Sequence, residues 1–272
     1  MWFDVFVVRA GNGENPGTLV CFHAHPDDET ILTGGTIARA AADGHRVVVV
    51  FATRGELGEN LDGIERSPDT LGAYRVTEAE RAAEILGAAR VAFLDYHDSG
   101  MAGEPTNAAA GAFSAANRED AAEHLAALLR EEHAEVVTTY DERGGYEHPD
   151  HVVVHHVGVR AAELAGTPRV YLATVSRQHF EEMSERHLAD PDGPPPPAPD
   201  VELGVDEARI TTVVDVRPVL KRKRAAMAAH ATQIAESSFF LSLPADAFAE
   251  VFGTEWFIRL DADPGHREDW IF

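Results

Sequence analysis

Short apolar stretches rich in β-branched residues recur along the first two thirds of this chain. Five of them are separated by segments long enough for a helix: residues 18–24, 47–52, 91–94, 136–139 and 170–175. Strands that alternate with helix-length segments are typical of a parallel sheet, because parallel neighbours need a crossover connection. The pattern therefore predicts an α/β fold.

The intervening segments have a helical composition. They are rich in alanine and leucine: residues 31–42, 71–86, 118–132 and 151–164. In the third segment, Ala121, Leu125 and Leu128 recur at three- and four-residue spacing and form one apolar stripe that suits packing against a sheet. We therefore expect a Rossmann-like, mostly parallel sheet with helices on both faces.

The last third of the chain has a different pattern. Residues 190–200 hold six prolines, which favour an extended and exposed loop. A strand is predicted at residues 210–214, a helix at 218–234 and a terminal apolar segment at 256–258.

Length and apolar content favour one domain. The chain has 272 residues, of which 44% are apolar, and this suffices for a complete α/β core. We expect a single domain over residues 1–272, with a Rossmann-like core in 1–175. Residues 201–272 are expected to form a smaller C-terminal layer that closes one side of a site at the sheet edge.

Charge and hydropathy argue against two classes of partner. Asp and Glu outnumber Lys and Arg by 46 to 23, and the formal net charge of -23 repels nucleic-acid phosphates and anionic lipid surfaces. No apolar run reaches the roughly 18 residues of a membrane span, and the first residues do not resemble a signal peptide. We expect a cytoplasmic protein without nucleic-acid or membrane partners. The single cysteine, Cys21, lies in an apolar run and is expected in the core.

A first polar cluster, His25-Pro26-Asp27-Asp28-Glu29, follows a predicted strand and precedes a predicted helix. Ligands of open α/β sheets bind where loops leave the carboxyl ends of strands. The imidazole of His25 and the carboxylate of Asp28 are ligand types that zinc and related divalent metals prefer. Asp27 cannot easily share the same coordination shell, so its carboxylate is placed to act as a general base. An aspartate that caps the helix would explain one acid but not the whole cluster.

A second cluster, Gly144-Gly145-Tyr146-Glu147-His148-Pro149-Asp150-His151, occurs in the same context after the fourth predicted strand. A catalytic zinc usually has three protein ligands and one open position, so His25 and Asp28 need one more partner. Either His148 or His151 can supply it, and the other is then free to protonate a departing amine. Asp150 could fix the tautomer of that histidine. A polar turn with solvated histidines is the alternative, but two His-Pro-Asp turns at one sheet edge argue against it.

Other histidines are weaker candidates. His155 lies four residues after His151 on the same helical face and is the best rival ligand. His23 and His45 are expected to flank the sheet without a function. The remaining helical histidines are expected on the surface.

With these residues, the sequence resembles the zinc-dependent N-acetylglucosaminyl deacetylases of the PIG-L or LmbE family. The turns His25-Pro26-Asp27-Asp28 and His148-Pro149-Asp150-His151 match the two signature motifs of that family, and the pair is highly specific. The resemblance implies metal ligation by His25, Asp28 and His151, with zinc as the cofactor and other divalent metals such as Fe²⁺ as alternatives. It also implies that Asp27 is the base and His148 the acid.

Further positions resemble those actinobacterial family members that deacetylate an N-acetylglucosaminyl-inositol precursor. Arg75 and Asp98 match positions that hold the sugar there, and Tyr146 falls where some members use a mobile tyrosine to steady the oxyanion. Leu32 and Glu147 depart from the pattern of these members. The resemblance implies a small-molecule amino sugar conjugate as the substrate.

Two other functions are compatible with the same motifs. One is an amidase that acts on thiol conjugates or on another small-molecule amide. The other is a non-catalytic sugar- or metal-binding protein of the same fold. The intact Asp27 and His148 argue against the second, because binding alone needs neither a base nor an acid.

Overall fold

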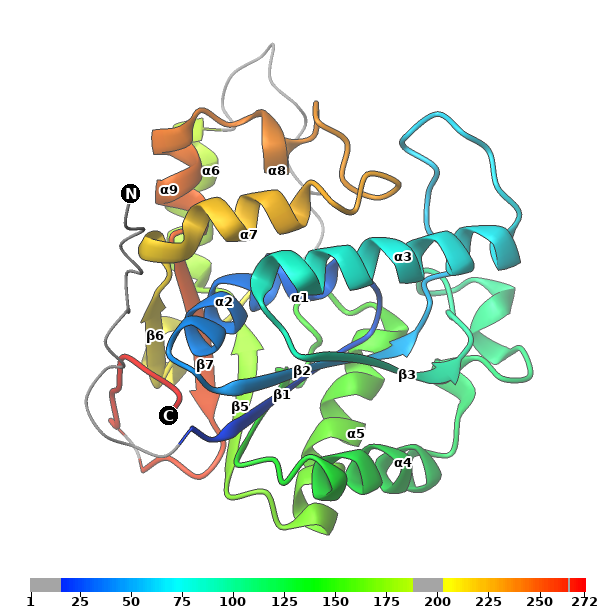
Figure 1. Cartoon of the computed structure of the whole chain (residues 1–272), viewed down its shortest axis with the longest axis horizontal. Helices are drawn as coiled ribbons and strands as arrows, with labels where there is room; N and C mark the ends of the chain where they lie inside the picture. Colours follow the sequence, from blue (N-terminus) through cyan, green and yellow to red (C-terminus); the bar gives the residue numbers. More distant parts are fainter. Residues whose placement is uncertain (1–15, 188–202, 264) are drawn as a thin grey trace, which may run out of the picture.

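Within the described residues, 16–187, 203–263 and 265–272, seven strands form one sheet in the order β3-β2-β1-β4-β5-β7-β6 (Figure 1). In this computed structural model, five parallel strands come first in the chain: β1 (Thr18–His23), β2 (Arg46–Thr53), β3 (Arg90–Tyr96), β4 (Val136–Tyr140) and β5 (Arg169–Thr174). The antiparallel strands β7 (Thr254–Arg259) and β6 (Thr212–Asp215) extend the same sheet beyond β5. The predicted mostly parallel α/β sheet is confirmed.

The strand order reverses at β1. After β1 the chain moves outward to β2 and β3, and it then returns to place β4 on the other side of β1. The connections after β1 and β4 therefore diverge at a topological switch point, where open α/β sheets leave a crevice for ligands. Both polar clusters predicted from the sequence, residues 25–29 and 144–151, directly follow these two strands.

Helices cover both faces of the sheet, as expected (Figure 1). One face carries α4 (Arg118–Glu131) and α5 (Pro149–Ala165). The other face carries α1 (Asp28–Leu32), α2 (Gly34–Ala42), α3 (Pro68–Leu86) and α7 (Leu220–Met227). Three further helices lie together near β7: α6 (Arg177–His187), α8 (Phe239–Ser242) and α9 (Ala245–Phe252).

The central strands supply the core. Val20 and Phe22 of β1 and Val48 and Val50 of β2 are fully buried. Parallel strands that are covered on both faces consist of nearly continuous apolar residues, which is why these strands could be located from the sequence. Among the described residues, no helix combines the length and the apolar composition needed to cross a lipid bilayer.

Local sequence sets the ends of the long helices. Ser67 caps α3 by accepting a hydrogen bond from the backbone N–H of Thr70, and Pro68 occupies the first helical turn. The same helix ends at Gly87, whose φ of 88° is left-handed and suits glycine. Helix α5 likewise begins at Pro149 and is followed by the left-handed Gly166.

The helix predicted over residues 31–42 was wrong in its continuity, because the chain breaks at Thr33 and forms two helices. Thr33 has a φ of -133°, and its hydroxyl donates a hydrogen bond to the carbonyl of Glu29. The carboxylate of Glu255 accepts the backbone N–H groups of Gly35 and Thr36 at 2.7 and 2.8 Å. Glu255 therefore satisfies the free N–H groups at the start of α2, and a second helix can begin there.

The C-terminal third also differs in detail from the prediction. The helix predicted over residues 218–234 ends at Met227. The segment that follows is instead hydrogen-bonded to a side chain of α3. Thr232 donates two hydrogen bonds to the carboxylate of Glu78, from its backbone N–H at 2.9 Å and its hydroxyl at 2.6 Å. The strand predicted at 210–214 is β6. The proline-rich stretch 190–200 lies outside the described residues.

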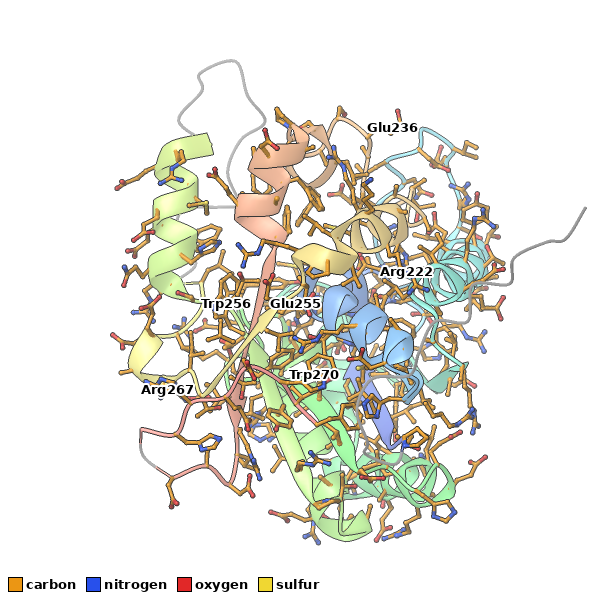
Figure 2. All side chains as sticks on the ribbon, turned by 60° about the vertical axis from the view of Figure 1, so that its left-hand side comes forward. Arg222, Glu236, Glu255, Trp256, Arg267 and Trp270 are labelled. Atoms are coloured by element: carbon orange, nitrogen blue, oxygen red, sulfur yellow. The ribbon has the colours of Figure 1, made fainter. Side chains whose placement is uncertain are left out.

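A buried ion pair joins the C-terminal third to the core. Lys223 Nζ of α7 lies 2.7 Å from Glu255 Oε1 of β7, and the two side chains are 1% and 2% exposed. Figure 2 labels Glu255 and its neighbour Trp256 where β7 passes α2. Because Glu255 also binds the start of α2, this pair ties three elements together beside the helix that carries Asp28.

Candidate active site

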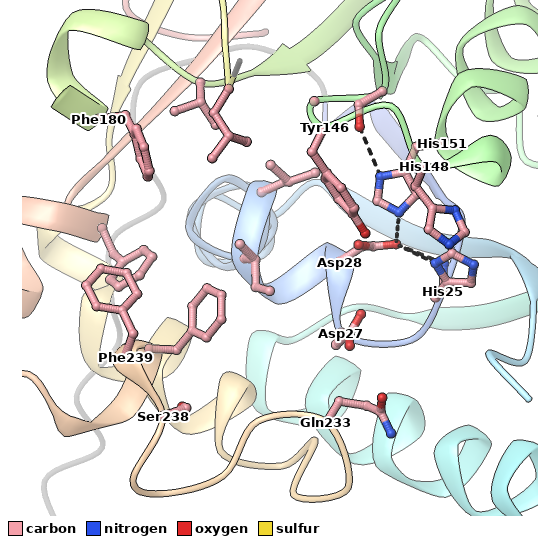
Figure 3. Close-up of a pocket in the computed structure, with 18 of the residues that line it drawn as sticks. His25, Asp27, Asp28, Tyr146, His148, His151, Phe180, Gln233, Ser238 and Phe239 are labelled. Carbon is pink, nitrogen blue, oxygen red and sulfur yellow. Dashed lines mark hydrogen bonds and ion pairs between the residues drawn. The ribbon is translucent and has the colours of Figure 1, made fainter. Parts of the chain in front are cut away.

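The two polar turns meet at the carboxyl edge of the sheet. The ring of His25, after β1, lies 4.8 Å from the ring of His148 and 5.4 Å from that of His151, centroid to centroid. Figure 3 shows these three rings grouped around the carboxylate of Asp28. The expected convergence of two distant segments on one place is thus present.

Three lone pairs face one another in this group. Asp28 Oδ2 lies 3.5 Å from His25 Nδ1 and 3.3 Å from His151 Nε2. The opposite ring nitrogens contact oxygen acceptors: His25 Nε2 lies 3.1 Å from Asp150 Oδ2, and His151 Nδ1 lies 3.1 Å from the carbonyl of Gly144. In neutral rings these outer nitrogens carry the hydrogens, and the inner nitrogens then have lone pairs directed at a carboxylate oxygen.

Such an arrangement calls for a cation. His151 Nε2 is buried and has no hydrogen-bond partner, so its lone pair is unsatisfied. Two imidazole nitrogens and one carboxylate oxygen form a donor set that suits zinc and other divalent metals with nitrogen and oxygen ligands. The residues of this cluster therefore fit a metal ion.

The neighbouring groups allow two other donor sets. Within the described residues, ligand atoms of His25, His148 and His151 lie within 4.8 Å of one another, and so do those of His25, Asp98 and Asp150. His148 Nδ1, however, accepts the backbone N–H of Asp150 at 3.2 Å, and Asp98 accepts backbone N–H groups of Leu57 and Gly100. Asp28 Oδ2 is likewise engaged, because it accepts the backbone N–H of His25 at 2.9 Å. The unpartnered His151 Nε2 is therefore the atom that favours a donor set containing His151.

The negative charge of the carboxylates around His25 also favours a cation in the cluster. Burial alone lowers the pKa of His25, but the carboxylates of Asp98, Asp150 and Asp28 outweigh it and hold this pKa well above its usual value. Burial alone would raise the pKa of Asp28, but His151 and His25 outweigh it and hold that pKa well below its usual range. The pocket thus stabilises positive charge at the point where the inner nitrogens meet Asp28.

Asp27 stands beside this cluster with a different set of contacts. Its Oδ2 accepts a hydrogen bond from Arg75 Nη2 at 3.2 Å, and its backbone N–H donates to Glu29 Oε2 at 2.9 Å. The residue has a φ of 119°, which is rare outside glycine and marks a strained backbone at a functional position. Burial raises the pKa of Asp27 to about 7, although Arg75 opposes the rise. A carboxylate with such a pKa suits a general base near neutral pH.

His148 is the N-cap of α5. Because its Nδ1 accepts the backbone N–H of Asp150, its Nε2 carries the hydrogen and is the free donor. Burial, followed by the charges of His25 and His151, lowers the pKa of His148 to about 3. His148 is therefore a neutral donor in the ground state of the site.

Asp150 has a different role from the predicted one. We expected its side chain to fix the tautomer of His148, but its backbone N–H does so, and the carboxylate bonds to His25 Nε2. The same carboxylate accepts hydrogen bonds from the backbone N–H and the hydroxyl of Ser99. Asp150 is fully buried, and its carboxylate fixes the orientation of the His25 ring.

The remaining predicted residues lie around the cluster. Arg75 is 3% exposed, and its guanidinium donates to the carbonyls of Gly55 and Pro26 as well as to Asp27. Asp98 Oδ1 lies 3.5 Å from His25 Nε2. Tyr146 is 37% exposed and lies over the cluster, with its ring centroid 4.8 Å from that of His151.

Other histidines lie outside the cluster. His155, the predicted rival ligand, contacts the carbonyl of Tyr140 through Nδ1 at 2.9 Å. His23 is buried beneath the site, where its two ring nitrogens contact the hydroxyls of Tyr140 and Thr33 at 3.0 Å each. Burial lowers the pKa of His23 to about 4, so this ring is a neutral part of the supporting structure.

The sequence did not reveal one buried pair beside Asp27. His230 Nε2 lies 2.7 Å from Glu29 Oε1, and both side chains are at most 1% exposed. Since Glu29 Oε2 also accepts the N–H of Asp27, the C-terminal third supports the backbone of Asp27. The motif His230-Ala231-Thr232-Gln233 is among those that resemble actinobacterial family members, but the histidine is 201 residues away from Glu29, so nothing in the sequence indicated this pairing.

The cluster opens into a cavity of about 1040 Å³. All predicted site residues except Asp150 line it. One arm is polar and contains Arg75, Asp98, Glu59 and Gln233. The opposite arm is formed by side chains of α6, α8, α9 and β7, which include four phenylalanines and one tryptophan.

Comparisons with known proteins agree with this geometry. The sequence profile of PIG-L, described as GlcNAc-PI de-N-acetylase, matches residues 20–162. The 1D-myo-inositol 2-acetamido-2-deoxy-alpha-D-glucopyranoside deacetylases of Thermobifida fusca and Streptomyces avermitilis are 40% and 42% identical to the chain. Each alignment covers 93% of this chain and 96% of the relative.

A solved structure shares the fold. The N,N'-diacetylchitobiose deacetylase of Pyrococcus horikoshii matches with a TM-score of 0.58 at 20% identity, over 91% of this chain and 84% of that one. Together with the profile match and the long alignments to relatives, this shows that the chain belongs to the PIG-L, or GlcNAc-PI de-N-acetylase, family.

Proposed function

We propose that this protein is a zinc-dependent N-deacetylase that hydrolyses the acetamide of a small N-acetylglucosamine conjugate, with N-acetylglucosaminyl-inositol as the first substrate to test. The observation that carries the proposal is the set of facing lone pairs of His25, Asp28 and His151, beside a carboxylate whose pKa is raised. The relatives at 40% and 42% identity are deacetylases of an acetamido sugar joined to inositol.

His25, Asp28 and His151 would hold the metal through Nδ1, the carboxylate and Nε2. A divalent ion there would polarise the acetyl carbonyl and make the attacking water more acidic. The two nitrogen ligands and one oxygen ligand suit zinc, and Fe²⁺ accepts the same donors. Asp150 keeps the Nδ1 lone pair of His25 directed inward by accepting the hydrogen on Nε2.

Asp27 would take the proton from water as the water oxygen forms its bond to the acetyl carbon. Its raised pKa allows it to hold this proton at neutral pH, and Arg75 keeps the carboxylate in place. Tyr146, whose side chain lies beside the cluster in Figure 3, would donate a hydrogen bond from its hydroxyl to the carbonyl oxygen, where negative charge develops.

His148 would serve the departing amine. It presents Nε2–H to the cavity, and the negative charge that develops on the acetyl oxygen favours its protonated form. A proton that binds Nδ1, in place of the hydrogen bond from the N–H of Asp150, would allow Nε2 to release its own proton to the amine nitrogen as the C–N bond breaks. The products are acetate and the protonated amino sugar. One proton of the water is balanced through Asp27, and the second leaves the new carboxyl group for the amine as acetate forms.

Arg75 and Asp98 are proposed to hold the sugar in the polar arm. Both line the cavity next to Asp27 and His25. Both are also engaged by the protein itself, so they offer the sugar only their remaining hydrogen-bonding capacity. Such contacts would hold the acetamide in a fixed orientation relative to the water and Asp27.

Acetate release and metal analysis test this proposal together. The purified protein is stripped with a chelator, reloaded with Zn²⁺, Fe²⁺ or Mg²⁺, and assayed on N-acetylglucosaminyl-inositol, N,N'-diacetylchitobiose and an N-acetylcysteine thioether conjugate. We expect activity with Zn²⁺ or Fe²⁺, none after stripping, and preference for the inositol conjugate. Preference for the thioether conjugate would favour an amidase, and a lack of turnover with every metal would favour a binding protein.

A further inference from the structure

The cavity has an apolar arm that the hydrolysis of a small acetyl group does not require. Five aromatic side chains and one methionine line it, together with smaller and polar side chains, and they come from four elements: Phe180 and Met183 of α6, Phe239 and Phe240 of α8, Phe252 of α9 and Trp256 of β7. Figure 3 shows Phe180 and Phe239 on the far side of the pocket from His25 and His148. The aromatic lining thus lies across the cavity from the reacting cluster.

The aromatic arm is a packed structure. The ring of Phe252 lies 6.0 Å from those of Phe239 and Phe240 and 4.8 Å from that of Phe248, centroid to centroid. Phe252 is 9% exposed and Phe248 1% exposed. The rings that line the arm are therefore backed by a buried cluster, which holds the arm open in a fixed shape.

The aromatic arm is continuous with the reacting cluster. Ile31 and Leu32 line the cavity and belong to α1, the same short helix that carries Asp28. Since Ile31 lies three residues after Asp28, the two side chains are on one side of the helix, one turn apart. An apolar chain attached at the reacting carbonyl could therefore enter the arm directly.

The geometry of the substrate amide determines which part of the substrate points into the aromatic arm. An amide is planar and normally trans, so its acyl chain and its nitrogen substituent extend in opposite directions. Under the proposed function, the sugar on nitrogen lies in the polar arm with Arg75 and Asp98. The acyl chain must then point away from that arm, toward Phe180 and Phe239.

We propose that the aromatic arm is a subsite for the acyl chain, and that the enzyme also hydrolyses amino sugar amides with linear acyl groups longer than acetyl. This inference rests on the proposed function, because the placement of the sugar fixes the direction of the chain. In each reaction the acyl C–N bond breaks and a C–O bond to water forms. The products are a fatty acid anion and the protonated free amino sugar.

The expected effect follows from the burial of methylene groups. Each buried methylene contributes about 0.8 kcal/mol, which corresponds to about a fourfold gain in kcat/KM per added methylene until the arm is filled. The gain should fall mainly on KM, because the chain is bound equally before and during the reaction. An acetyl group reaches little of the arm and should be insensitive to its aromatic residues.

The test is a chain-length series on one conjugate, with N-acetyl, N-butanoyl, N-hexanoyl and N-octanoyl glucosaminyl-inositol. The unmodified protein is compared with Phe239→Asp, with Phe239→Leu and with the control Leu260→Ser, at a 48% exposed position that does not line the cavity. We expect kcat/KM to rise with chain length in the unmodified protein, in Phe239→Leu and in the control. Phe239→Asp should abolish the rise, so that kcat/KM no longer increases with chain length.

Two results would overturn the inference. One is a fall in kcat/KM with chain length that is the same in all four proteins. The other is a gain that appears only when an octyl group replaces inositol and the acetyl group is kept, because the aromatic arm would then bind the aglycone.

If the proposed function is wrong, the result is different: no conjugate of the series is hydrolysed, and this includes the N-acetyl conjugate. Binding still decides the inference in that case. Calorimetry with Asp27→Asn should show tighter binding of the octanoyl than of the acetyl conjugate, and Asp27→Asn with Phe239→Asp should lose this difference. Equal binding of both conjugates to Asp27→Asn would refute the subsite.

Discussion

Replacing Asp27 by asparagine separates the chemistry of the site from its metal binding. The substitution changes one carboxylate oxygen into an amide group of nearly the same size. Asparagine can still accept a hydrogen bond from Arg75 Nη2, and the backbone N–H still donates to Glu29. Asparagine also adopts positive φ angles more readily than most residues, so the φ of 119° remains accessible. Fold and metal content should therefore persist.

The magnitude follows from the loss of the base. A positioned general base contributes about 10²- to 10⁴-fold to the rate, so kcat should fall by about that factor, which equals roughly 2.7 to 5.4 kcal/mol in activation free energy. His151→Ala should lose activity for another reason. It removes the buried Nε2 that lies 3.3 Å from Asp28, so the metal itself should be lost.

The assay pairs acetate release with metal content measured by mass spectrometry after gel filtration. The matched control is His155→Ala. His155 lies on α5 like His151, but outside the cluster, and its ring contacts the carbonyl of Tyr140. The control should keep metal and most activity. Equal metal retention in Asp27→Asn and His151→Ala would refute the assignment of His151 as a ligand and Asp27 as the base.

Two further predictions test the support of the site. Asp150→Ala removes the acceptor 3.1 Å from His25 Nε2 and should weaken metal affinity by about 10- to 100-fold in a chelator competition, whereas unchanged affinity would show that Asp150 does not orient His25. Lys223→Ala leaves the buried Glu255 without its cation and should lower the free energy of unfolding in urea by about 3 to 5 kcal/mol. The exposed Lys221→Ala should change it by less than about 0.5 kcal/mol, and equal effects would contradict the role of the pair.

The order of strands and helices could be predicted because the central strands are buried on both faces. Runs such as Val47–Val50 are apolar at every position, which marks them in the sequence. The break at Thr33 could not be predicted in the same way. It depends on Glu255, about 220 residues later, whose carboxylate binds the start of α2. Local composition carries no information about such a contact.

The residues of the candidate site were predicted because both motifs directly follow strands that are neighbours in the sheet. His25 and His151 were thus expected at one edge, and the structure brings their rings together. The contacts behind them could not be predicted. Asp150 was expected to act on His148 through its side chain, yet that carboxylate reaches His25. The partner of Glu29, His230, comes from a segment that the sequence pattern placed in a longer helix.

Anomalous diffraction from crystals of the zinc-loaded protein, measured on both sides of the zinc absorption edge, is the most direct test of the proposed metal centre. One strong peak is predicted at roughly 2.0 to 2.2 Å from His25 Nδ1, the Asp28 carboxylate and His151 Nε2, with one coordination position left open. A peak held instead by His25, Asp98 and Asp150, or no peak near His151, would contradict the proposed metal centre and the mechanism built on it.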